Sequence, residues 1–152
     1  MTETRIELIS PKLRKRFDSA TETQLRQVAY AVSRAIVERF GLTQPIITRA
    51  LECLSRHELP TDDMQAEVQA YADEVDSAYL DLSDKQDTGR ASQEQVSVAF
   101  SKARAASAVA FALADSALLA ACEATYEAAS AVDNATEITS IADKILSDDH
   151  VA

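Results

Sequence analysis

The sequence predicts an all-α protein, a single compact bundle of six or seven helices. Its 152 residues include only two glycines and three prolines, so few positions favour a turn. Alanine, leucine, glutamate, glutamine and arginine are abundant, and all five favour helices. Since a chain of this length can bury its own core, we expect residues 1–152 to form one all-helical domain with Ala-rich central helices.

The first predicted helix is short and basic. Ser10 is a good N-cap, and the proline that follows it is favoured at the first helical position. The helix should run from Pro11 to about Asp18. Residues 1–20 would then form a basic N-terminal arm and helix.

Capping signals also mark both ends of the second helix. Thr21 and Gln24 have the spacing of a capping box. Apolar residues then recur at helical spacing as far as Phe40. Gly41 suits the left-handed conformation that ends many helices.

The third and fourth helices are separated by a break at 59–61, the tripeptide Leu-Pro-Thr. Thr43 is the expected cap of the third helix. The fourth helix carries an apolar stripe from Met64 to Leu82. Residues 83–92, SDKQDTGRAS, form the longest loop signal in the chain, so we expect a flexible loop there.

Three more helices complete the predicted bundle. Ser92 and Gln95 repeat the capping-box spacing and open the fifth helix. Asp115 is expected to open the sixth, and either Asp133 or Asn134 the seventh.

The run from Lys102 to Ala131 consists mainly of alanine and other small or apolar residues. A membrane span, a low-complexity tail and the packing centre of a soluble protein all have to be considered. Asp115 lies within the run, and a carboxylate at mid-bilayer costs about 2.5–3.5 kcal/mol on insertion scales. Alanine offers little compensation in lipid, whereas small residues let soluble helices approach closely. We therefore expect no membrane association and a core position for this run.

Charge is distributed unevenly along the chain. The net charge is −10, with +3 in residues 1–40 and −13 in residues 41–152. Residues 61–87 alone contain nine acids and one lysine. Such a field repels nucleic-acid backbones and attracts basic partners, although an acidic surface also favours solubility.

The acids of the fourth helix surround most of its solvent side, and among them only Asp81 has a lysine four positions on. Like charges at this density destabilise a helix. Two explanations account for acids kept at this cost: they bind a basic protein surface, or they only keep the helix soluble. The candidate partner-binding residues are Asp62, Asp63, Glu67, Asp73, Glu74, Asp76 and Asp81, with Asp84 and Asp87 in the loop that follows.

The chain carries no pattern typical of an enzyme. It has no Gly-rich phosphate loop and no nucleophile elbow. His57 and His150 lack the carboxylate spacing of a metal site, and the pair Glu123 and Glu127 is expected to be solvated. We expect no catalysis, no cofactor and no metal.

The two cysteines and the N-terminus indicate a reducing compartment. Cys53 and Cys122 occupy apolar positions, so reduced core thiols are expected, and no motif supports a disulfide or redox pair. Because the first ten residues lack the pattern of a secretory signal, we expect a cytoplasmic protein.

Residues 37–54 resemble a helix-turn-helix. Thr43, Gln44, Thr48 and Arg49 would be the side chains that meet base edges. Any pair of helices with a capped second member shares this pattern, and the surrounding negative charge argues against a nucleic-acid partner. A helix-turn-helix DNA-binding regulator that uses residues 37–57 is the alternative functional hypothesis.

Two segments suggest a family. Pro45 opens a helix containing ITRALECL, and after an acidic middle the run KARAASAVAFALADSALLAACEATYEAAS begins with an Ala-Arg-Ala motif. This order, over about residues 24–146, resembles the all-helical immunity proteins of bacterial polymorphic-toxin systems. The resemblance implies a non-catalytic protein that binds and neutralises a cognate toxin, often a nuclease. The partner would then be a basic toxin domain.

Overall fold

A computed structural model confirms the all-α class and describes residues 4–148. Throughout these residues the regular elements are helices, without a strand. They are the 3₁₀ turn η1 (Ile6–Leu8) and the helices α1 (Pro11–Asp18), α2 (Glu22–Phe40), α3 (Pro45–Ser55), α4 (Asp62–Asp87), α5 (Gln93–Ala112), α6 (Ala117–Ser130) and α7 (Thr136–Asp148).

Most of the predicted helix ends are confirmed. The Ser10 hydroxyl accepts from the backbone N–H of Leu13 at 3.1 Å, and a complete capping box joins Thr21 and Gln24. A second box opens α5 at Ser92, and Thr61 caps α4. Gly41 ends α2 with φ of +65°, which glycine adopts without strain.

Two predicted helix starts are shifted by one residue. Gln44, not Thr43, is the N-cap of α3, where Pro45 supplies the favoured first residue instead of a side-chain cap. Ser116, not Asp115, caps α6 and accepts from the Leu119 N–H at 3.2 Å. Helix α7 begins at Thr136, and of the two residues expected to open it, Asn134 does so: its carboxamide oxygen accepts from the Thr136 N–H at 3.1 Å.

The predicted loop over 83–92 is wrong for its first half. Helix α4 continues to Asp87, so only residues 88–92 connect α4 to α5. Leu82, Ser83 and Gln86 lie half-buried in this last part of α4, which packs along α5. This packing outweighs the polar composition of the segment, because tertiary contacts override local propensity.

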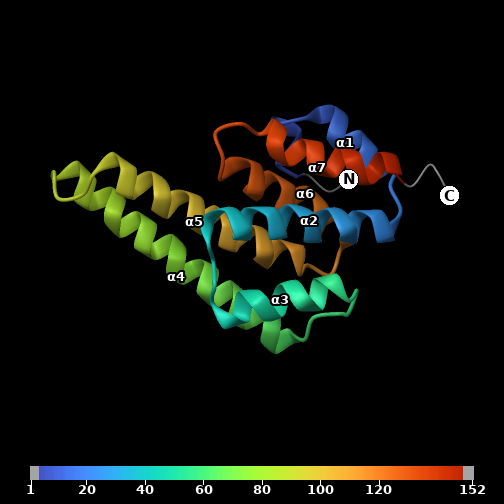
Figure 1. Cartoon of the computed structure of the whole chain (residues 1–152), viewed down its shortest axis with the longest axis horizontal. Coiled ribbons are helices and arrows are strands. Elements are labelled where there is room, and N and C mark those ends of the chain that lie inside the picture. Colours follow the sequence, from blue (N-terminus) through green and yellow to red (C-terminus); the bar gives the residue numbers. More distant parts are fainter. Residues whose placement is uncertain (1–3, 149–152) are drawn as a thin grey trace.

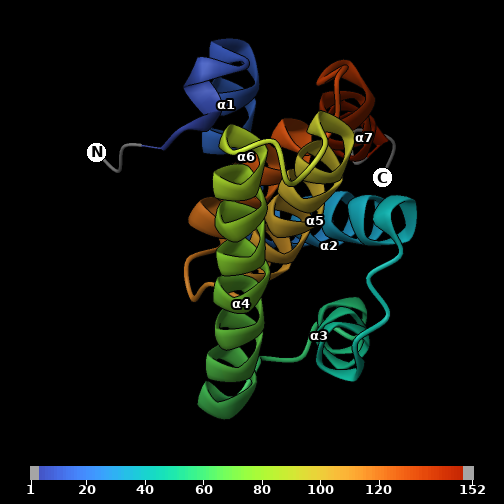
Figure 2. The ribbon, with the colours of Figure 1, turned by 90° about the vertical axis from the view of Figure 1, so that its left-hand side faces the viewer.

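The helices form a body with a projecting hairpin. Figure 1 shows α2, α6 and the C-terminal half of α5 at the centre of the body, with α1 and α7 together on one side and α3 on the other. The hairpin consists of the C-terminal half of α4 and the N-terminal half of α5, which extend beyond the body, whereas the start of α4 lies beside α3. Figure 2 shows α4 upright at the front of the view, from the bottom of the molecule to below α1. One side of α4 therefore has no helix packed against it.

Alanine side chains form much of the core, as expected for the Ala-rich run. Helices α5 and α6 contribute the fully buried Ala103, Ala105, Ala106, Ala108, Ala112, Ala120, Ala121, Ala124 and Ala128. Helix α2 contributes more of the larger buried apolar side chains than any other element, including Val28, Val32 and Ile36. Helix α2 is thus central as well, beside the Ala-rich α5 and α6.

Close packing of α6 predicts a strong size limit at Ala124. Because Ala124 is fully buried, Ala124→Leu should destabilise the fold by about 1–3 kcal/mol through overpacking. The matched control is Ala70→Leu on the exposed side of α4, which should change stability by less than about 0.5 kcal/mol. Urea unfolding measures both, and an equal effect of the two substitutions would show that α6 is not closely packed.

Candidate functional site

The acidic residues of α4 share its outer side. Of the nine candidate partner-binding residues, all except the half-buried Asp76 are exposed. The opposite side of the helix carries Val68 and Ala72, which are buried against the rest of the protein. Asp84 and Asp87, expected in a loop, belong to α4 and extend the same acidic surface. We call these nine side chains the α4 acidic face.

Few of these carboxylates are used inside the protein. Within residues 4–148, the salt bridges that reach the α4 acidic face are Arg49 to Glu67 at 3.2 Å and Arg104 to Asp76 at 2.8 Å. Asp73 accepts a hydrogen bond from Gln69 on its own helix at 2.9 Å. The face therefore presents a largely uncompensated negative surface to solvent.

A large apolar side chain lies within the α4 acidic face. Leu80 is 53% exposed, although most leucines of this protein are buried or half-buried. It stands one helical turn from Asp76 and one turn from Asp84, so these three side chains line up along the helix. An exposed leucine flanked by carboxylates combines an apolar centre with a charged rim.

The pair Glu123 and Glu127, expected in solvent, is buried on α6, so that prediction is wrong. The Glu127 side chain is 2% exposed and that of Glu123 is 8% exposed. Arg5 binds both: its Nη2 lies 2.7 Å from Glu127 Oε1, and its Nε donates to Glu123 Oε2 at 2.8 Å. The sequence alone does not indicate that Arg5 pairs with Glu123 and Glu127, because these residues lie more than a hundred positions apart.

Arg104 of α5 extends the network toward α4. Its Nη1 donates to Glu127 Oε2 at 3.1 Å, and its Nη2 donates to Asp76 Oδ1 at 2.8 Å. Each oxygen of Glu127 thus has its own arginine. We call Arg5, Glu123, Glu127, Arg104 and Asp76 the buried charge network. It joins the N-terminal arm, α6, α5 and α4, and it accounts for Asp76 as a structural residue.

Aromatic rings complete the surroundings of Arg5. Its guanidinium carbon lies 4.4 Å from the centroid of the Tyr126 ring and 5.4 Å from that of Phe111. Burial lowers the pKa of Arg5, but the hydrogen bonds that Arg5 donates to Glu123 and Glu127, together with their negative charges, outweigh that effect and raise the pKa overall. The surroundings of Arg5 therefore favour the charged form of its guanidinium.

Both cysteines are free and buried, in agreement with the expected core thiols. Burial raises the pKa of Cys122 to about 11, although the nearby Arg14 opposes the shift. The pKa of Cys53 is also raised, by burial and then by the charge of Glu58. Protonated, enclosed thiols are poor nucleophiles and poor metal ligands.

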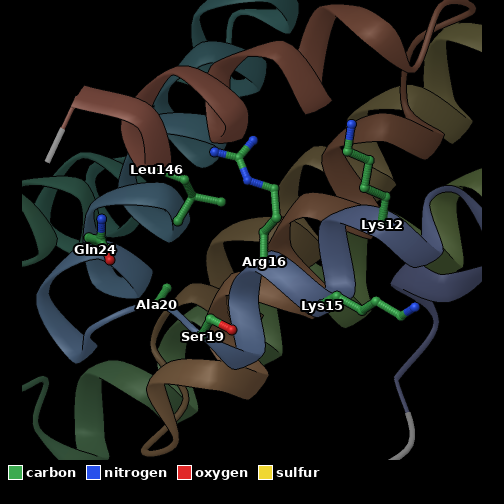
Figure 3. Close-up of a pocket in the computed structure, with 7 residues that line it drawn as sticks. All are labelled: Lys12, Lys15, Arg16, Ser19, Ala20, Gln24 and Leu146. Carbon is green, nitrogen blue, oxygen red and sulfur yellow. The ribbon is translucent and has the colours of Figure 1, made fainter. Parts of the chain in front are cut away.

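A basic hollow of about 420 Å³ lies between α1, α7 and the start of α2. Figure 3 shows that Lys12 and Lys15 extend in different directions, while Arg16 reaches toward α7. Arg16 is held there by Asp143 and by Ser147 Oγ at 3.1 Å. The charged groups do not converge on one point, so the hollow lacks the geometry of an anion site.

The proposed recognition residues of the helix-turn-helix, Thr43, Gln44, Thr48 and Arg49, are exposed. However, Arg49 is paired with Glu67 of the α4 acidic face. A nucleic acid that approached α3 would therefore also approach this negative surface.

No protein-family model matches this chain, and no curated protein or solved structure is similar enough to match it.

None of the helices described between residues 4 and 148 combines the length and the apolar character that crossing a membrane requires. In the same part of the chain, no three His, Cys, Asp or Glu side chains gather as a metal site would need. His57 is an exposed residue with φ of +56°, and His150 lies outside the described residues.

The buried charge network predicts that Glu127 is more important for stability than an exposed acid. Removal of one partner from a buried ion pair costs about 3–5 kcal/mol, so Glu127→Ala should destabilise the protein by about 3 kcal/mol or more. The control is Glu38→Ala, which breaks the exposed pair with Arg34 and should cost about 0.5 kcal/mol or less. Comparable losses in urea unfolding would contradict a structural role for the network.

The thiol environments predict low reactivity in the folded protein. At pH 7.5, iodoacetamide should modify Cys53 and Cys122 only slowly, because both are buried and their raised pKa values keep them protonated. In denaturant both should react rapidly. Mass spectrometry of the two reactions provides the test, and fast native labelling at Cys122 would show that α6 is not enclosed as described.

Proposed function

We propose that this protein is a non-catalytic binding protein that uses the α4 acidic face to bind and neutralise a basic protein toxin. The observation that carries the proposal is the solvent-facing set of carboxylates on α4, of which only Glu67 and Asp76 are ion-paired within the described residues. Repulsion among such charges destabilises the free protein, and a basic partner relieves it.

The chemistry of the partner follows from the shape of the surface. A helix of 26 residues presents carboxylates over about 39 Å, a length that suits an extended basic surface better than a single charged side chain. A nuclease binds the phosphate backbone of its substrate through such a basic surface. Carboxylates placed where phosphates would bind give fast, electrostatically steered association and compete with the substrate.

Leu80 supports a protein partner in particular. Interfaces concentrate their binding energy in a central apolar contact that a polar rim shields from water. Leu80 has that position within the α4 acidic face, between Asp76 and Asp84. A nucleic acid or a small cation offers no apolar pocket for the Leu80 side chain.

A direct test is co-expression with the toxin domain encoded beside this chain's own gene. We expect a neighbouring gene for a large toxin with a variable C-terminal domain, and we expect this protein to restore growth of cells that express that domain. Absence of such a gene, or failure to restore growth, would contradict the proposal and direct attention to operator binding by residues 37–57.

The charge contribution can be measured on the purified complex. Asp73→Asn, Glu74→Gln and Asp84→Asn together should weaken binding at least tenfold and reduce its dependence on salt, because three rim carboxylates are lost. Asp76 stays unchanged since it belongs to the buried charge network. The control removes the same charge elsewhere, with Glu52→Gln, Glu58→Gln and Asp133→Asn, and should bind as the parent protein does.

The apolar contribution has its own matched pair. Leu80→Ala should weaken binding about tenfold or more while leaving the stability of the free protein nearly unchanged, because the side chain is already half in water. Leu59→Ala removes an 87% exposed leucine outside α4 and serves as the control. Equal binding by the two variants would place the interface away from the α4 acidic face.

A further inference from the structure

The residues around Arg5 form a complete receptor for a guanidinium group. Glu123 and Glu127 accept from its nitrogens at 2.6–2.8 Å, and the rings of Tyr126 and Phe111 lie against its face. Planar, delocalised cations fit such a combination of paired carboxylates and aromatic rings better than an ammonium does. We call these four side chains the guanidinium socket.

The socket belongs to the helical body, whereas its occupant does not. Glu123, Tyr126 and Glu127 lie on α6, and Phe111 lies on α5. Arg5 comes from the short segment before η1, and its side chain is 41% exposed although the carboxylates beneath it are buried. The cation therefore enters from the solvent side, by a route that remains open at the surface.

The socket requires a cation whether or not Arg5 supplies it. Arg104 contacts only one oxygen of Glu127, and within the described residues the hydrogen-bond and ion-pair partners of Glu123 all belong to Arg5. Without Arg5, two buried carboxylates one helical turn apart would repel each other. A guanidinium from another source would restore the hydrogen bonds that the Arg5 side chain makes, whereas the bond to Glu123 Oε1 comes from the backbone N–H of Arg5.

We propose that the guanidinium socket is a binding site for an arginine side chain of a protein partner, which exchanges with Arg5. The N-terminal arm then acts as an internal ligand that holds the socket in its binding geometry until the partner arrives. The inference rests on the proposed function only for the origin of that arginine. Through Arg104, the socket is connected to Asp76 on α4.

The test uses the full chain with Arg5→Ala and needs no natural partner. The probes are methylguanidinium and the peptide acetyl-Gly-Arg-Gly-amide, with the lysine peptide acetyl-Gly-Lys-Gly-amide as the control. Isothermal titration and the thermal midpoint measure binding. We expect the variant to bind both guanidinium probes at least tenfold more tightly than the parent protein, and more tightly than the lysine peptide.

A second substitution establishes where the probes bind. Glu123→Gln added to Arg5→Ala should abolish the gain, because one carboxylate of the socket is lost. If Arg5→Ala does not fold, Arg5→Gln keeps a hydrogen-bond donor and replaces it in the same titrations. Equal binding by variant and parent, equal binding of the arginine and lysine peptides, or binding of methylguanidinium without the arginine peptide would each overturn the proposal. None of these results depends on the α4 acidic face, so the two proposals can fail separately.

Discussion

The charge of Glu127 is the constraint on which the arrangement of the helices depends. Its side chain is almost completely enclosed on α6, and a buried carboxylate is tolerated only when it is paired and hydrogen-bonded. Arg5 satisfies one oxygen and Arg104 the other. Because these arginines come from the N-terminal arm and from α5, and Arg104 also binds Asp76 on α4, a single carboxylate places three separate segments around α6.

Small side chains make this arrangement possible. Helix α6 is covered with alanine, so α2 and α5 approach it closely enough for long arginine side chains to cross between elements. The alanine surface supplies little hydrophobic energy per residue, and the ion pairs add specificity of position. The network also separates the acids of α4 into two kinds. Asp76 faces inward to Arg104, while most of the others remain available at the surface.

Capping residues and apolar periodicity were sufficient to predict the fold class and most helix boundaries, because both are local signals. The extent of α4 was not predictable from them, since the residues from Ser83 to Asp87 are helical through packing on α5. The α4 acidic face was visible as a charge pattern. The guanidinium socket was not, because its parts join residue 5 to residues 111–127, and a lone pair of glutamates on a helix is usually solvated.

The most direct test of the central role of Glu127 is a double-mutant cycle with Arg104. The free energy of unfolding would be measured in urea for the parent, Arg104→Ala, Glu127→Ala and the double variant. If the two side chains stabilise the fold as a pair, the double variant loses less stability than the sum of the single losses, by about 1–3 kcal/mol. Losses that add to within about 0.5 kcal/mol would contradict this account, since they would show that Glu127 does not hold α5 against α6 through its charge.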